Sequence, residues 1–219
     1  EKTALTTDLG DGFTLSRVRF APAADAPRHR GPEFPSEGRI LVIGSTIEAA
    51  SRVVEGLAGP DAKIGYLPLD RLLTIEERDL VTELSDWTTA APLAGAINLV
   101  SWGQEPQQAA AVSQAMFKLA RALEQATPPN AEQPAGWPLP FFVTLLGLRD
   151  RAHAVGDGCP THEDPVTGAL AGLTRALARE WSGSIVRVVA LDRDPTQDAL
   201  SNQLGERLAD ELATSRPGT

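Results

Sequence analysis

Short apolar runs alternate with amphipathic stretches along the sequence, and this alternation limits the folds open to the chain. The order strand, then helix, begins at residue 39 and recurs to the end of the sequence. We therefore expect an α/β fold with a doubly wound, mostly parallel sheet covered by helices on both faces. The expected elements are the strands Ile40–Ile43, Lys63–Leu69, Gly95–Trp102, Leu139–Leu146 and Ile185–Leu191 and the helices Glu48–Leu57, Thr74–Ser85, Pro106–Ala126, Val166–Trp181 and Thr196–Ala213.

Local signals mark several helix ends and faces. Gly59 and Pro60 should end the first helix, and Thr74 with Glu77 has the spacing of a capping box. Asp164 should cap the fourth helix, with Pro165 in its first position. Two apolar stripes predict buried helix faces: Val112, Met116, Leu119 and Leu123 on one helix, and Leu200, Leu204, Leu208 and Leu212 on the last.

The first 38 residues differ in composition from the rest. Phe13–Phe20 alternates like a strand, and the segment after it holds four prolines that exclude a helix or a central strand. We expect two parts: residues 1–38 as an N-terminal arm with one strand and a Pro-rich linker, and residues 39–219 as one Rossmann-like domain.

Charge and cysteine content exclude several classes of partner and location. The net charge is −9, which disfavours binding to nucleic acid or to an anionic membrane surface, since both require clustered Lys and Arg. The single cysteine, Cys159, excludes an internal disulfide and suits a reducing compartment. The N-terminus lacks the pattern of a signal peptide, and no apolar run is long enough to span a bilayer. We expect a cytoplasmic location.

The turn after the first strand departs from a dinucleotide-binding turn. RILVIGST (residues 39–46) contains only Gly44, whereas the pyrophosphate fingerprint needs three closely spaced glycines at a helix N-terminus. Ile47, Glu48 and Ala49 follow, and an acid in the first helical turn would repel a phosphate. The pattern predicts a Rossmann-like scaffold with a degenerate cofactor site, so we assign no cofactor-binding residue.

The one tyrosine, Tyr66, does not have the sequence surroundings of a reductase tyrosine. A reductase of this fold uses a Tyr with a Lys four residues later, but Tyr66 is followed at that distance by Asp70, which would raise a phenol pKa. We expect Tyr66 to be a core or sheet-face residue. Asp70 follows the second strand, where an acid could bind a ribose, but without the glycine turn we favour a solvated loop residue.

Other catalytic and metal motifs are weak or absent. Cys159 and His162 have Cys-x-x-His spacing beside Glu163 and Asp164, but a zinc site needs three or four ligands, and nothing marks an oxyanion hole for a cysteine nucleophile. His29 and His153 have no ligand spacing around them. The sequence contains no G-x-S-x-G elbow and no phosphate-binding loop. We therefore expect no catalytic residue and no metal.

The aromatic residues invite a second interpretation, because a cluster of them on the surface would mark a docking face. They lie at the ends of expected elements or in apolar runs, so we favour core and interdomain packing. They are Trp87, Trp102, Trp137, Trp181, Phe141 and Phe142.

Asp164–Asp192 carries a resemblance to a known family. It reads DPVTGALAGLTRALAREWSGSIVRVVALD, with small residues in a helix, then Arg175 and the pair Arg179–Glu180, then a strand that ends in Asp192. This resembles the structural subdomain of ketoreductases in type I polyketide synthases, which are related to the short-chain dehydrogenase/reductase fold. Earlier segments resemble further parts of that subdomain in chain order: FTLSRVRFAPA its opening strand, then RILVIGST, GAINLVSWG and LPFFVTLLGL.

The resemblance implies a role without catalysis. In that family the first of two Rossmann-like halves has lost its cofactor site and braces the second, which binds NADPH and reduces a carrier-bound β-keto thioester. This chain resembles the first half, so NADPH is expected in the catalytic half and none in this chain. Its implied partner is the catalytic subdomain of the same polypeptide, with contact to acyl-carrier-bound intermediates only indirectly. The arm strand and the helix Pro106–Ala126 are the candidate docking elements.

Two alternatives stay open from the sequence. One is a free-standing enzyme like the short-chain reductases with an atypical nucleotide site, and the other is an inactive ketoreductase-like module that serves assembly. The first needs a phosphate cradle and a general acid, neither of which the sequence supplies.

Overall fold

The computed structural model describes most of the chain after residue 38. The described ranges are 5–8, 14–17, 38–44, 46–100, 106–127, 139–147, 165–191 and 201–214. The strands are β1 (Leu5–Asp8), β2 (Thr14–Arg17), β3 (Arg39–Gly44), β4 (Lys63–Pro68), β5 (Leu93–Asn98), β6 (Phe141–Gly147) and β7 (Ile185–Leu191). The helices are α1 (Ile47–Ala58), α2 (Leu69–Thr74), α3 (Glu77–Ala90), the 3-10 turn η1 (Pro106–Gln108), α4 (Ala109–Ala126), α5 (Pro165–Glu180) and α6 (Ser201–Thr214).

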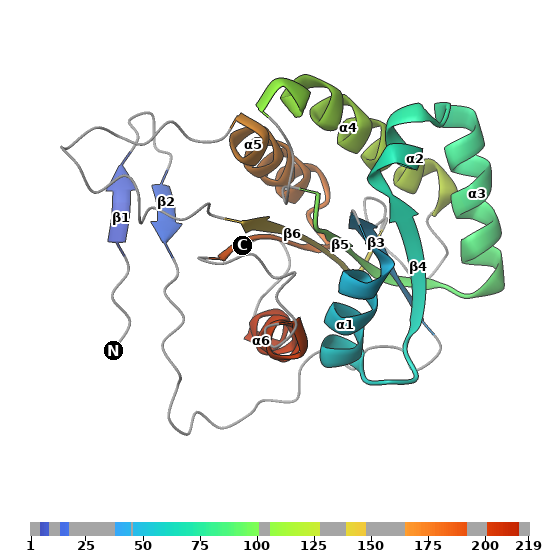
Figure 1. Ribbon diagram of the computed structural model, residues 1–219, viewed down its shortest axis with the longest axis horizontal. Coiled ribbons are helices and arrows are strands. Elements are labelled where there is room, and N and C mark those ends of the chain that lie inside the picture. Colours follow the sequence, from blue (N-terminus) through green and yellow to red (C-terminus); the bar gives the residue numbers. More distant parts are fainter. Residues whose placement is uncertain are drawn as a thin grey trace.

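A five-stranded parallel sheet forms the centre of the fold (Figure 1). Its strand order is β4-β3-β5-β6-β7, and every neighbouring pair is parallel. The α/β, doubly wound, Rossmann-like architecture expected from the sequence is therefore confirmed. Strands that are covered on both faces read as continuous apolar runs, which explains why Phe141–Gly147 was recognisable from sequence.

Helices cover the two faces of the sheet unequally (Figure 1). On one face α2, α3, α4 and α5 pack over a core that includes Met116, Phe142 and Trp181. On the other face α1 and α6 pack over a core that includes Val42 and Leu208. Alternate residues of each strand contribute to the two cores, as the period of two in a strand requires.

Helices α1 and α6 approach each other closely at Gly205. A Cβ built on Gly205 would lie 2.5 Å from backbone atoms of Val53, Gly56 and Leu57. Only a residue without a side chain fits there, so α6 lies directly against α1. Leu204, Leu208 and Leu212 of α6 are buried in the core on this face of the sheet, as their spacing predicted. Leu200 lies outside the described residues.

Two expectations about elements need correction. The third main strand is Leu93–Asn98 and ends four residues before Trp102. Thr74 does not cap α3: it is the last residue of α2, a helix the sequence did not predict, and its hydroxyl donates to the carbonyls of Asp70 and Arg71. The residue before α3 is Glu76, which makes no side-chain capping bond.

The arm contains a strand where one was expected, and a second. β2 lies within the predicted strand Phe13–Phe20 and pairs antiparallel with β1, with Leu5 opposite Arg17. The proposed cap Asp164 falls outside the described residues, while Pro165 is the first residue of α5, as predicted. Within the described part of the chain, no helix is both long and apolar enough to cross a bilayer.

Candidate functional site

The order of the strands locates the place where a ligand would bind such a sheet. From β3 the chain passes to β4 on one side and then to β5 on the other, so the direction of winding reverses between β3 and β5. In open α/β sheets ligands bind outside the carboxyl ends of the strands at this reversal. The candidate site therefore lies around Gly44 at the end of β3 and Asn98 at the end of β5.

Leu99 fills the space beside Gly44. A Cβ built on Gly44 would lie 3.2 Å from the Cβ of Leu99 and 3.7 Å from its Cδ1. Leu99 is 2% exposed, and its N–H donates to the carbonyl of Ile43 over 2.7 Å, which extends the β3–β5 pairing past the end of β5. A side chain at this position would crowd Leu99, which would have to shift by a few tenths of an ångström.

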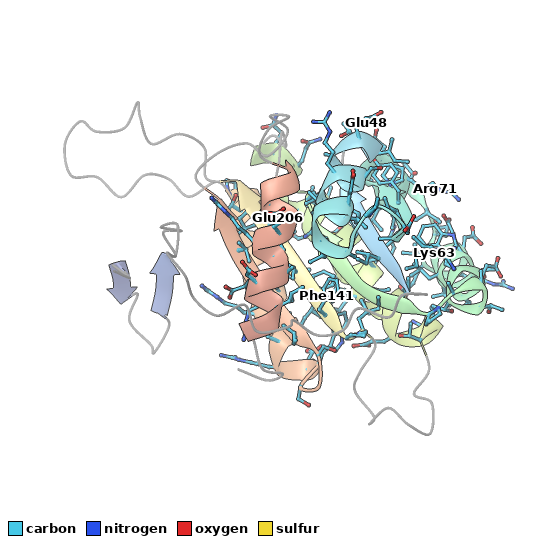
Figure 2. All side chains as sticks on the ribbon, turned by 90° about the horizontal axis from the view of Figure 1, so that it is seen from below. Glu48, Lys63, Arg71, Phe141 and Glu206 are labelled. Carbon is cyan, nitrogen blue, oxygen red and sulfur yellow. The ribbon has the colours of Figure 1, made fainter. Side chains whose placement is uncertain are left out.

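Helix α1 caps its own N-terminus. Thr46 is the N-cap residue, and its Oγ1 accepts a hydrogen bond from the N–H of Ala49 over 3.3 Å. Glu48 stands in the first turn, where its charge complements the helix dipole. In Figure 2 Glu48 lies at the surface at the start of α1.

Tyr66 on β4 contacts the end of β3 at Gly44. Its hydroxyl donates to the carbonyl oxygen of Gly44 over 3.2 Å, and its ring is half-buried against the α1 face of the sheet. Burial raises the pKa of Tyr66 above its ordinary value, and the carboxylates of Glu48 and Asp70 raise it further. The phenol therefore stays protonated and serves as a hydrogen-bond donor, in agreement with its prediction as a sheet-face residue.

Three buried polar side chains form a chain of hydrogen bonds on the opposite face of the sheet. Asn98 Nδ2 lies 3.5 Å from Thr144 Oγ1, which lies 2.6 Å from Thr174 Oγ1 on α5. Thr174 also donates to the carbonyl of Leu170, and Asn98 Oδ1 accepts from the N–H of Val100. Each member thus has a partner within the protein, so the chain of bonds fastens α5 to the sheet.

The remaining sequence-predicted site residues are not brought together. Asp70 is exposed in the first turn of α2, so it is solvated as predicted, although it lies on a helix and not in a loop. His29, His153, Cys159, His162 and Glu163 lie outside the described residues. Among the residues that the structure describes, no three His, Cys, Asp or Glu side chains are grouped to hold a metal ion.

The predicted packing role of the aromatic residues is confirmed where it can be seen. Phe142 and Trp181 are buried with ring centroids 5.7 Å apart in an edge-to-face arrangement, and the indole N–H of Trp181 donates to Glu124 Oε1. Phe141 is also buried, and Trp87 packs against the core from α3. Trp102 and Trp137 lie outside the described residues.

The outward surface of α4 carries an aromatic side chain that none of these contacts uses. Phe117 is 55% exposed midway along the helix, between the exposed residues Gln114 and Arg121. The neighbouring helix α5 presents the exposed small residues Gly168, Gly172 and Ala176. A Cβ built on either glycine would meet no atom within 4 Å. We call these six residues the α4–α5 surface.

Sequence reasoning missed Leu99, the Asn98–Thr144–Thr174 hydrogen bonds and the exposure of Phe117. A signal existed only for Phe117, because it falls outside the apolar stripe of its helix. The other contacts join residues that are far apart in the sequence, so local patterns do not reveal them.

Comparisons with known proteins show the fold. No family model matches the sequence, and no curated protein matches it. A protein assigned to the short-chain dehydrogenases, from Escherichia coli CFT073, is 15% identical, with a TM-score of 0.50 over 84% of this chain and 94% of that chain. A short-chain dehydrogenase from Salmonella enterica subsp. enterica serovar Typhi str. CT18 is 14% identical, with a TM-score of 0.49 over 90% of this chain and 96% of that chain. At these identities the similarity is one of fold.

Proposed function

We propose that this chain is a non-catalytic structural subdomain that braces the catalytic half of a ketoreductase of the polyketide-synthase type. NADPH and the carrier-bound β-keto thioester would belong to the catalytic half, and this chain would contact the carrier only indirectly. The proposal includes a cytoplasmic location and no binding of nucleic acid or membrane, consistent with the net charge of −9.

The observation that carries the proposal is the exposure of Phe117. Aromatic residues, phenylalanine among them, are enriched in the buried core of protein interfaces relative to the rest of the surface. The inner face of the same helix is buried in the core through Val112, Met116 and Leu119, so the helix is held in place without a partner.

The α4–α5 surface suits a helical partner. Because Gly168 and Gly172 leave their surroundings open, a partner helix could approach the backbone of α5 closely, and Phe117 beside it would fill a pocket in that partner. A catalytic half seated here would have its own helices held by a rigid neighbour, which would keep a cofactor cleft in one geometry.

The residues of the chain favour a structural role over a catalytic one. The only tyrosine, Tyr66, donates to a backbone carbonyl and has Asp70 where a reductase of this fold has lysine. We accordingly assign no catalytic, cofactor-binding or metal-binding residue to the described part of the chain.

Reconstitution would test the proposal. The catalytic half of the parent reductase would be produced alone and together with this chain, and NADPH oxidation would be followed with a β-keto thioester as substrate. We expect no turnover by this chain alone, and a catalytic half that is active and resistant to heat only when this chain is present. NADPH oxidation by this chain alone would favour the free-standing enzyme instead.

A further inference from the structure

We infer that the carboxyl end of β3, where a sheet of this fold holds the diphosphate of a dinucleotide, is sealed by the chain's own residues. Leu99 occupies the space beside Gly44, and Thr46 accepts a hydrogen bond from an N–H that a phosphate could otherwise use. The carboxylates of Glu48 and Asp70 are negative and would repel a phosphate. The inference goes beyond the bracing role, because it concerns this chain by itself and holds whichever partner covers α4.

Space is the first obstacle. In a dinucleotide-binding turn the glycines let the backbone approach the pyrophosphate closely. Here the side of Gly44 that lacks a Cβ faces Leu99, whose Cβ stands 3.2 Å from the position a Cβ would occupy. Leu99 belongs to the buried core that α1 covers, together with Val42 and Ile97, so its position is held by packing.

The second obstacle is the loss of donors. A helix N-terminus binds phosphate through backbone N–H groups that have no partner within the helix. The N–H of Ala49, one of these groups, is bonded to the side chain of Thr46, whereas the bond from the N–H of Ala50 to the carbonyl of Thr46 is the first bond of the helix itself. β3 ends at Gly44 and α1 begins at Ile47, so the Thr46 cap lies close to the strand end. A ligand in this short turn would have to displace the Thr46 cap.

Charge is the third obstacle. The hydroxyl of Tyr66 is bonded to Gly44, and the carboxylates of Glu48 and Asp70 are close enough to this phenol to disfavour its ionisation. A diphosphate near Gly44 would therefore stand beside two carboxylates. Like charges at short range repel, and because both carboxylates are exposed, water and salt screen part of this repulsion.

Site-specific NMR with NADPH as the probe tests the seal. The full chain, labelled with ¹⁵N, would be titrated with NADPH to about 5 mM at constant ionic strength, and the amide signals of Gly44, Ile47, Glu48 and Ala49 followed. We expect no saturable change in their positions. Saturable shifts at these amides in the natural chain would overturn the inference.

A double variant separates charge from space. Glu48→Gln with Asp70→Asn removes both carboxylates and leaves Leu99 and Thr46 in place, and the dispersion of its spectrum reports whether it is folded. We expect the four amides to remain unshifted by NADPH in this variant as well. If the variant gains saturable binding, charge alone excludes the ligand, and the assignment of Leu99 as the seal is wrong.

The outcome is separable from that of the reconstitution experiment. Binding of NADPH at Gly44 would contradict the inference of a sealed strand end, but it would not bear on whether α4 docks a partner. Failure of the catalytic half to associate with this chain would remove the bracing role and leave the sealed strand end as it is.

Discussion

The hydroxyl oxygen of Thr144 on β6 lies 2.6 Å from that of Thr174 on α5, and both side chains are buried. This bond joins the sheet to a helix whose other buried residues, Val166, Leu170 and Leu177, are apolar. Because both hydroxyls are removed from water, each depends on the other for part of its hydrogen bonding.

The free energy of unfolding lost on replacing both threonines should therefore be smaller than the sum of the losses from the two single replacements. We expect Thr174→Val to lower the free energy of unfolding by about 1–3 kcal/mol, since it leaves Thr144 poorly bonded in the core. Thr144→Val with Thr174→Val should cost less than the sum of the single variants, with a coupling of about 0.5–3 kcal/mol. Urea denaturation of the four proteins measures both quantities, and strict additivity would contradict the pairing.

The contact between α6 and α1 gives a second prediction. Gly205→Ala would place a Cβ 2.5 Å from the backbone of α1, so we expect α6 to be pushed away at a cost of about 1–3 kcal/mol. Gly172→Ala on α5 is the matched control, since its Cβ would stand in open space. The control should stabilise the protein by about 0.5–1 kcal/mol through helix propensity. Equal effects of the two substitutions in thermal unfolding would contradict the close packing of the helices.

Tyr66 can be titrated without interference, because it is the only tyrosine in the chain. Burial and the carboxylates of Glu48 and Asp70 raise the pKa of Tyr66 above 10.0 in the folded state. We expect the phenolate absorbance near 295 nm to rise with a midpoint above that of free tyrosine. Glu48→Gln should lower the midpoint, and a midpoint at or below 10.0 in the natural protein would contradict the environment described.

The same shift fixes the sign of a pH effect on stability. The folded-state pKa of Tyr66 lies above the unfolded value, so the stability that this group contributes is fully present below about pH 10. It is lost as the pH rises through the folded-state pKa. Tyr66→Phe should lack this component, which unfolding measured between about pH 8 and pH 11 would reveal.

Local patterns predicted the elements well and their assembly poorly. The stripe Val112, Met116, Leu119 and Leu123 is buried as its spacing indicated, because a helix that lies on a sheet must bury one face. The strand order β4-β3-β5-β6-β7 depends on how each crossover helix packs, which periodicity does not encode. The contact of Leu99 with Gly44 depends on that order and was equally hidden.

The incorrect cap at Thr74 has a local cause. Thr74 and Glu77 have capping-box spacing, but the hydroxyl of Thr74 is already used by the carbonyls of Asp70 and Arg71 at the end of α2. A threonine can bond either to the turn before it or to the helix after it. The sequence offered both choices, and the short helix α2 decides between them.

Two large apolar side chains are exposed among the residues that the structure describes, and they provide a matched test of the docking surface. Phe117 on α4 is 55% exposed and Ile47 on α1 is 51% exposed, and their helices cover opposite faces of the sheet. We expect either Phe117→Ser or Ile47→Ser to change the stability of the isolated chain by no more than about 0.5 kcal/mol.

Only Phe117→Ser should weaken association with the catalytic half, by roughly tenfold or more, as expected for an aromatic anchor at an interface. Sedimentation velocity of each mixture measures the difference. Equal binding by the two variants would place the partner away from α4.

The number of NADPH molecules bound by the assembled pair tests the account most directly. Equilibrium titration of the complex between this chain and the catalytic half should give one NADPH per complex, and the same titration of this chain alone should give none. Two molecules per complex, or one on this chain alone, would mean that both halves hold cofactor and that this chain is more than a brace.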